Sequence, residues 1–274
     1  MNKYLISIAL MAGCLFNLPA QTYPELVKRS IEYLEVDDYA AAEQVLKTAM
    51  KKEPANPNNP ILMSHLGIIQ HVLNKYDEAL ISYSVALANH PDDPLTRHNR
   101  AALFCDMDSI YSALNDYNTL LSYNSIDIEA LYRRALIYLN QKNEQSALAD
   151  FLKIEEIDSG NLHAQMGRAL IMKRQGEWEK AESLYTNLIY DNKNNSELYM
   201  NRSECYLELN RLAKAQEDIN KASALGNNDS YLYILRGRLK LRQYDKLAAK
   251  ADFMTAKELG ANNEVIDDLL KQCK

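Results

Sequence analysis

Alanine recurs every thirty-four residues along most of this 274-residue chain. The series runs through six copies without a slip, and one further alanine precedes it by thirty-seven residues. A fixed period of this length is the sequence signature of a repeat architecture, in which each repeat packs mainly against its neighbours. The alanines are Ala42, Ala79, Ala113, Ala147, Ala181, Ala215 and Ala249.

Apolar side chains follow each alanine at helical spacing. A large apolar residue stands four positions after the alanine, and another apolar residue stands three positions further on. Steps of four and three residues place side chains on one face of an α-helix. The first of these two columns is Leu46, Tyr83, Tyr117, Phe151, Tyr185, Ile219 and Phe253. The second is Ala49, Ala86, Leu120, Ile154, Leu188, Ala222 and Ala256.

A second helix is expected before the alanine in every repeat. Twelve residues ahead of each alanine the side chain is small, which allows two helices to approach closely. Four residues before that small position the side chain is mostly large and apolar, although Arg97 and Gln165 break the rule. The small residues are Ser30, Gly67, Ala101, Ala135, Ala169, Ser203 and Gly237.

These columns resemble the tetratricopeptide repeat, whose pattern is W-x2-L-G-x2-Y, then A-x3-F, then A and P over thirty-four residues. The resemblance implies an all-α fold, a right-handed α-solenoid of about seven helix-turn-helix repeats whose first helices line a concave surface. The array is expected over residues 21–263, with repeats near 23–56, 60–93, 94–127, 128–161, 162–195, 196–229 and 230–263. Departures are modest: the tryptophan position is never Trp, and Gln70 and Lys240 replace an aromatic residue of the first helix.

Both ends of the array have special features. Residues 53–60 form a junction that is three residues longer than the others and rich in proline, so the stack could bend there. Residues 264–274 carry an apolar stripe that suits a helix capping the last repeat. The single tryptophan, Trp178, lies in a turn between helices, where we expect packing rather than ligand binding.

The composition excludes several function classes. The chain has 31 basic and 37 acidic residues and a net charge of −6, the opposite of the basic stripe that nucleic-acid binding requires. No phosphate-binding glycine motif, HExxH motif or nucleophile elbow occurs. We therefore expect no nucleic-acid partner, no cofactor and no enzymatic activity. Cys105, Cys205 and Cys273 are too sparse for a disulfide framework.

Residues 1–20 have the pattern of a secretory signal peptide: a lysine, an apolar run and a Leu-Pro-Ala end. The run is too short for a membrane-spanning helix, and no later segment is longer. An alternative stays open, because Met11-Ala12-Gly13-Cys14 resembles the bacterial lipobox, in which the cysteine is acylated. We expect cleavage after Ala20 and a periplasmic protein, or otherwise a lipoprotein anchored at Cys14.

Arginine recurs at the seventh position of six repeats, and aspartate stands sixteen residues later in four of them. The arginines are Arg29, Arg100, Arg134, Arg168, Arg202 and Arg236, and the aspartates are Asp116, Asp150, Asp218 and Asp252. Opposite charges on facing helices predict internal ion pairs, although the arginines alone could form an anion-binding stripe. Arg168 has no aspartate of its own, and we expect it to reach Asp150 of the preceding repeat.

Positions 2, 5, 6, 9 and 13 of each first helix lie opposite its packed positions and define what we call the inner face. In the second to fourth repeats this face is rich in apolar residues, which predicts a contiguous recognition strip. The alternatives are scattered apolar residues without a partner, or contact with a second copy of the chain. The candidate partner-binding residues are Ile61, His65, Ile68, Val72, His98, Asn99, Tyr132, Arg133 and Leu136.

The inner face of the later repeats is charged instead. Basic Lys173 and Arg174 are followed by Glu197, Glu204 and Glu208, and then by Arg238 and Arg242. Alternating sign fits polar recognition, and equally a solvated groove wall. The Lys-Asn-Asn-Lys-Arg clamp with which chaperone adaptors of this family hold a carboxylate is absent.

Two functions remain. We predict a non-enzymatic scaffold of the cell envelope that binds a peptide or helix of a protein partner in the concave groove. The alternative is a self-assembling structural protein of the envelope. A metal site of His65, His71, His98 and Cys105 would lie on neighbouring first helices, but no pair has compact ligand spacing, so we expect no bound metal.

Overall fold

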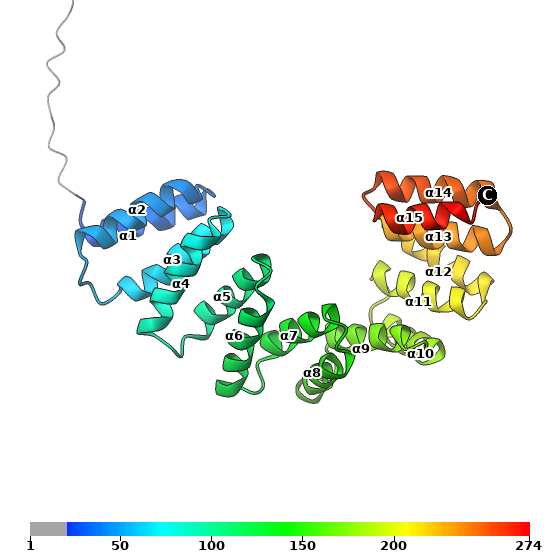
Figure 1. Cartoon of the computed structure of the whole chain (residues 1–274), viewed down its shortest axis with the longest axis horizontal. Helices are drawn as coiled ribbons and strands as arrows, with labels where there is room; N and C mark the ends of the chain where they lie inside the picture. The colour runs from blue at the N-terminus through cyan, green and yellow to red at the C-terminus, as the bar shows by residue number, and fades with distance from the viewer. Residues whose placement is uncertain (1–20) are drawn as a thin grey trace, which may run out of the picture. The chain divides into compact units, whose positions relative to one another are not determined.

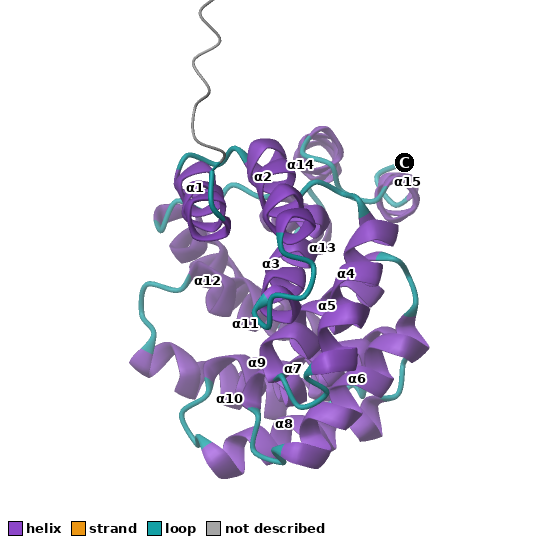
Figure 2. Cartoon of the chain, turned by 90° about the vertical axis from the view of Figure 1, so that its left-hand side faces the viewer, coloured by secondary structure: helices purple, strands orange, loops and turns teal. Residues whose placement is uncertain are grey.

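The structure is a computed structural model that describes residues 21–274. The predicted signal peptide and the lipobox cysteine lie outside the described residues. Over the described range the chain forms fifteen α-helices and no strand (Figures 1 and 2). The helices fall into two compact units, one that ends at Tyr123 and one from Asn124 to Lys274. We call them the N-terminal and the C-terminal unit and describe each by itself.

The N-terminal unit contains three helix pairs. Thr22 begins the first helix with a reciprocal capping box to Glu25, and Asp93 caps the fifth helix in front of Pro94. The helices are α1 (Tyr23–Glu35), α2 (Tyr39–Lys52), α3 (Asn59–Val72), α4 (Tyr76–Asn89), α5 (Pro94–Asp106) and α6 (Ile110–Tyr123).

The C-terminal unit contains four helix pairs and a short last helix. Asp or Asn side chains cap every first helix of these pairs by accepting a hydrogen bond from a backbone N–H of the first turn. The helices are α7 (Ile128–Asn140), α8 (Glu144–Ile157), α9 (Leu162–Arg174), α10 (Trp178–Asp191), α11 (Ser196–Glu208), α12 (Leu212–Ala224), α13 (Ser230–Arg242), α14 (Lys246–Glu258) and α15 (Asn263–Lys271).

The turn inside each pair contains one residue in the left-handed region of backbone conformation. Only one of the seven is a glycine, with φ of 75° at Gly176; the other six have φ between 55° and 62°. Asp and Asn tolerate this conformation, whereas Lys142 and Tyr244 pay a steric cost of about 1 kcal/mol. The seven residues are Asp37, Asn74, Asp108, Lys142, Gly176, Asn210 and Tyr244.

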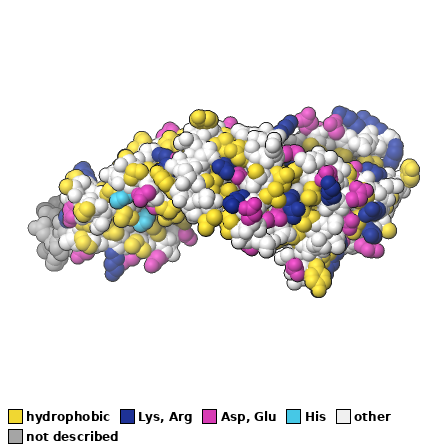
Figure 3. Space-filling view, turned by 90° about the horizontal axis from the view of Figure 1, so that it is seen from below, with side chains coloured by type: hydrophobic (Ala, Val, Ile, Leu, Met, Phe, Trp, Pro, Cys, Tyr) yellow, Lys and Arg dark blue, Asp and Glu magenta, His cyan; other side chains and the backbone are white. Residues whose placement is uncertain are grey.

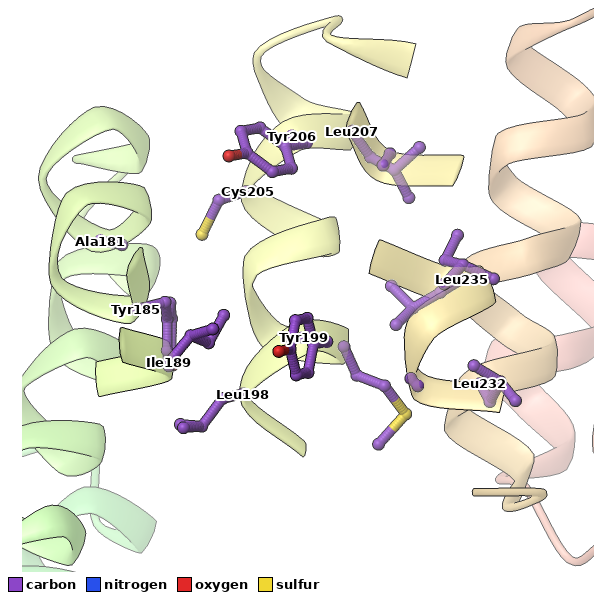
Figure 4. Close-up of a cluster of buried hydrophobic side chains, with 14 of the residues drawn as sticks. Ala181, Tyr185, Ile189, Leu198, Tyr199, Cys205, Tyr206, Leu207, Leu232 and Leu235 are labelled. Atoms are coloured by element: carbon purple, nitrogen blue, oxygen red, sulfur yellow. The ribbon is translucent and has the colours of Figure 1, made fainter. Parts of the chain in front are cut away.

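The predicted columns form the core. All seven alanines of the period are fully buried, and the large residue four positions later is buried in every repeat. In the C-terminal unit, Figure 4 shows Tyr185 and Ile189 of α10 directed toward Leu198 of α11, with Leu232 and Leu235 of α13 beyond α11. Every buried side-chain nitrogen and oxygen atom within residues 21–274 has a hydrogen-bond partner.

Small residues do bring the paired helices together. A Cβ atom built on Gly67 of α3 would lie 2.6 Å from the ring of Tyr83 on α4, and one on Gly237 of α13 would lie 2.5 Å from the ring of Phe253 on α14. Such distances are too short for real atoms, so these rings rest directly on the backbone of the partner helix.

The arginine and aspartate columns pair within the four repeats that carry both residues, as predicted. Arg134 donates to both carboxylate oxygens of Asp150 at 2.6 and 2.9 Å, and the equivalent pairs of Arg100, Arg202 and Arg236 have shortest contacts of 2.5–2.7 Å. The prediction for Arg168 is wrong: its Nε lies 3.0 Å from Glu155, not near Asp150. Both oxygens of Asp150 already accept hydrogen bonds from Arg134, whereas Glu155 lies five residues further along α8.

The structure describes the proline-rich junction, Trp178 and the C-terminal helix, for which the sequence made separate predictions. Across the proline-rich junction α2 and α3 remain in contact, and the division between units falls at Tyr123 instead. Trp178 packs against the core of the C-terminal unit, as expected. Ile266 of α15 is fully buried and covers Phe253 of the last repeat, whereas Val265 is half exposed.

Candidate functional site

The nine candidate residues differ in how accessible they are. In the N-terminal unit Ile61, His65 and Val72 are exposed, and Ile68, His98 and Asn99 are partly buried. In the C-terminal unit Arg133 is exposed, and Tyr132 and Leu136 are partly buried. Six of the nine candidates therefore belong to the N-terminal unit and three to the C-terminal unit.

A first hollow lies between α1 and α3 in the N-terminal unit. Its volume is about 550 Å³, and its apolar wall includes Val27 and Ile31 of α1 and Ile61 of α3. Ile31 and Ile61 are 52% and 51% exposed. Lys28 and Glu53 stand at its border. The hollow is therefore an apolar surface with few charges.

A second hollow lies between α3 and α5 and shares Ile61 with the first. Its volume is about 500 Å³, and its lining includes His65 of α3 and Leu95 of α5, the latter 58% exposed. Asp92 lies at the rim, and no ion pair of Asp92 exists within the described part of the chain. The two hollows give this unit an inner face with aliphatic side chains at its centre.

The remaining candidates of this unit do not extend that surface. Ile68 is partly buried and packs against the buried cluster of Ala79, Tyr83 and Leu103. Val72 is eleven residues, or about 16 Å of helix, beyond Ile61. The predicted contiguous strip along α3 is thus interrupted at Ile68.

His71 and Asp106 form a pair at the far end of α3 and α5. The His71 Nε2 atom lies 2.7 Å from the Asp106 carboxylate. His98 packs edge-on against Tyr117. No group of three His, Cys, Asp or Glu side chains close enough to hold a metal ion occurs in residues 21–274.

A further hollow of about 630 Å³ lies at the proline-rich junction, against Met50, Met63 and Val85. None of the nine candidates lines it. Its lining comes from α2, the junction itself, α3 and the end of α4.

The C-terminal unit has a hollow of its own on the inner face. Its volume is about 340 Å³, and it combines an aromatic floor with one carboxylate. It includes Tyr132 and Leu136 of the candidates but not Arg133, which pairs with Glu129 at 2.6 Å. Its lining residues are Tyr132, Leu136, Leu139, Phe151, His163, Met166, Gly167, Leu170, Tyr185, Glu197 and Asn201.

The charged residues beyond this hollow pair with one another. Glu204 of α11 accepts from Arg238 at 3.1 Å and from the Tyr231 hydroxyl at 2.8 Å, and it also contacts the buried ammonium of Lys173. Burial alone would raise the pKa of Glu204, but these partners outweigh it and hold the pKa below its ordinary value. Arg238 also binds Glu208.

Because these side chains pair with one another, the alternating charges hold the helices together. The network ties α9, α11 and α13 together and leaves these groups few free hydrogen-bonding positions. Figure 3 shows one face of the molecule, on which basic and acidic side chains are interspersed rather than separated.

The candidate residues predicted from the sequence did not include Val27, Ile31 and Leu95, although the inner-face rule for the second to fourth repeats already covered Leu95. They occupy positions 5 and 9 of the first repeat and position 2 of the third. The inner-face rule selects all three positions, so the signal was present. The candidate list did not include the first repeat, and it left out Leu95.

Comparison with known proteins identifies the class. Family models of the tetratricopeptide repeat match residues 27–94, 111–161 and 172–239. The crystal structure of a tetratricopeptide repeat protein from Parabacteroides merdae ATCC 43184 is 40% identical, with a TM-score of 0.78 over 93% of this chain and 99% of that chain. The chain therefore belongs to the tetratricopeptide repeat family, whose members generally act as protein-interaction scaffolds.

More distant structures share the fold alone. Pseudomonas aeruginosa pilF is 14% identical, with a TM-score of 0.63 over 78% of this chain and 98% of that chain. YrrB, a TPR protein with an unusual peptide-binding site, is 15% identical, with a TM-score of 0.51 over 78% of this chain and 98% of its own. No curated protein sequence matches the chain. None of the described helices has the length and apolar character needed to cross a bilayer.

Proposed function

We propose that this protein is a non-enzymatic scaffold that binds a segment of a protein partner, a peptide or a helix, on the inner faces of its first helices. The observation that carries the proposal is the pair of hollows that meet at Ile61. Ile31, Ile61 and Leu95 are each about half exposed there, and apolar surface grouped in this way usually marks a recognition site.

The mechanism follows from how the surface is built. Each of the three aliphatic side chains projects from a helix whose opposite face is fixed in the core, so it loses little conformational freedom on binding. Because little entropy is lost, a few apolar side chains are enough to provide the binding affinity. A partner segment with aliphatic or aromatic side chains would complete the burial.

The proposed setting is the cell envelope. Its support is the composition of residues 1–20, which favours export with cleavage after Ala20 and leaves acylation at Cys14 as the alternative. Intact mass of the protein isolated from its source cells distinguishes a chain that starts at Gln21 from one that starts at an acylated Cys14. A retained Met1 would refute export.

Site-specific photocrosslinking in the source cells tests the binding surface. A photoreactive amino acid at position 61 is compared with one at position 81, because Ile81 is 63% exposed on α4 and lies outside both hollows. We expect a discrete crosslinked partner from position 61 and not from position 81. Equal crosslinking from both positions would refute the surface.

The same experiment separates the scaffold from a self-assembling protein. Light scattering of the wild type and of Ile61→Asp gives the oligomeric state of each. A crosslink from position 61 to a second copy, together with an oligomer that Ile61→Asp dissociates, would replace the scaffold with self-assembly.

A further inference from the structure

The inner-face hollow of the C-terminal unit has a floor of aromatic rings. Gly167 of α9 has no side chain, and the Phe151 ring reaches within 2.3 Å of where a Cβ would stand. Tyr132 of α7 lies over this region, with its ring centroid 6.4 Å from that of Phe151 and 5.6 Å from that of His163. The rings present negative faces, which attract a cation placed against them.

One carboxylate, that of Glu197, borders the hollow. Glu197 is exposed at the start of α11, and no ion pair within residues 21–274 involves it. Its charge contributes, after burial, the Cys205 thiol and Glu204, to raising the pKa of the Tyr185 phenol. The other three acidic residues of the same face, Glu129, Glu204 and Glu208, already hold basic partners.

The chain itself shows that such surroundings accept a cation. The ammonium of Lys173 lies 5.9 Å from the centroid of the Tyr185 ring while it is bound to Glu204. The Arg202 guanidinium similarly lies 5.6 Å from the Tyr206 ring while it pairs with Asp218. A ring and a carboxylate together therefore form a recurrent cation site in this unit, and at Glu197 the cation is not supplied by the described residues.

We propose that this hollow receives an arginine side chain of the partner segment, whose guanidinium stacks on the Tyr132 ring and pairs with the Glu197 carboxylate. Arginine fits better than lysine, because its planar group can stack and donate two parallel hydrogen bonds at once. The apolar walls around Leu136 and Met166 would cover the aliphatic stem. This inference deepens the proposed scaffold function and rests on it.

The test uses the methyl group of Met166 as a reporter inside the hollow. Protein labelled with ¹³C at methionine methyl groups is titrated with N-acetyl-arginine N-methylamide and, separately, with the citrulline analogue, which has nearly the same shape and no charge. Met166→Leu assigns the signal. We expect a saturable shift with the arginine probe and about tenfold weaker binding of the citrulline probe.

Glu197→Gln provides the decisive comparison. It should reduce arginine binding to the citrulline level, whereas Glu179→Gln, the same charge change at an exposed site on α10, should leave the tenfold preference intact. Tyr132→Leu should weaken the arginine probe several-fold and leave the citrulline probe nearly unchanged. Equal binding of the two probes by the wild type, or an unchanged preference in Glu197→Gln, would overturn the inference.

Failure of this site and failure of the scaffold function give different results. The Glu197→Gln variant leaves Ile61 and its hollows untouched, so partner crosslinking from position 61 reports on the scaffold alone. A position-61 crosslink without probe discrimination overturns only the arginine site. Absence of that crosslink overturns the proposed function.

Discussion

Glu43 offers the sharpest test of what holds the first two repeats together. Its buried carboxylate accepts from Lys47 and Lys75, each at 2.6 Å, and from the Gln70 amide at 3.3 Å. Gln70 in turn accepts from the Ser82 hydroxyl at 2.6 Å. Gln70 replaces the aromatic residue of the family pattern, so a polar network stands where apolar packing is usual. We expect Glu43→Gln to loosen this part of the N-terminal unit.

The magnitude follows from the titration of Glu43. Burial alone would raise its pKa, but the hydrogen bonds from Lys47, Lys75 and Gln70 outweigh burial and lower the pKa from 4.5 to about 2. At ~1.4 kcal/mol per pKa unit this lowering corresponds to at most about 3.5 kcal/mol. Both ammonium groups are about half exposed, and solvent screening reduces the expected effect to about 2 kcal/mol.

Hydrogen exchange measured by mass spectrometry is the appropriate assay, because the single tryptophan lies in the other unit. At pH 7, Glu43→Gln should increase amide exchange in α2 and α3 by about thirtyfold. Because the folded pKa is the lower one, the stabilisation is complete above pH 4.5 and is lost as the pH falls toward 2. The difference between variant and wild type should therefore shrink over that range.

Glu32→Gln is the matched control. Glu32 is exposed and lies 3.7 Å from Lys28, which is more exposed still, so the loss of the Glu32 charge should change exchange by less than threefold. If Glu43→Gln behaves like Glu32→Gln, or if its effect is the same at pH 3 as at pH 7, the network does not stabilise the junction.

Three further predictions concern single residues. Burial raises the pKa of the Cys205 thiol to about 12, so at pH 8 a thiol reagent should label Cys273 and leave Cys205 unlabelled until urea is added. Tyr244→Gly, at a left-handed position that is almost fully exposed, should stabilise the last repeat by up to about 1 kcal/mol in urea unfolding. Ile266→Asp should destabilise it by about 3 kcal/mol and speed amide exchange in α14; unchanged exchange would refute the capping role of α15.

Much of the fold could be predicted because one period governs it. The alanine column, the large column after it and the small column before it each became core, since steps of three, four and thirty-four residues fix both the helix face and the neighbouring repeat. The boundary between compact units could not be predicted. It falls at Tyr123, where the sequence shows no change of period, whereas the proline-rich junction does not divide the chain.

The candidate surface was predicted less well, because exposure depends on neighbours as well as on helix position. Ile61 and Ile68 are seven residues apart and lie on nearly the same face of α3, yet Ile68 packs against the buried cluster of Ala79, Tyr83 and Leu103. At position 2 of α3 and of α5, by contrast, no neighbouring side chain covers the residue, and Ile61 and Leu95 stay exposed. The repeat period predicts the direction in which a side chain points. It does not predict how long the neighbouring side chain is, and therefore not whether that neighbour covers it.

The charged half of the inner face shows the same limit and indicates where recognition can occur. The alternating charges along α9, α11 and α13 fit both a polar binding surface and a set of charges that pair with one another. Because Glu204 pairs with Lys173 and Arg238, most of these charges are already neutralised within the protein. A partner that used these groups would first have to break contacts of comparable strength, so they contribute little net affinity. Glu197 keeps a carboxylate that no such contact occupies. We therefore expect this face to select its partner through the unpaired Glu197 carboxylate rather than through the stretch with the most charged residues.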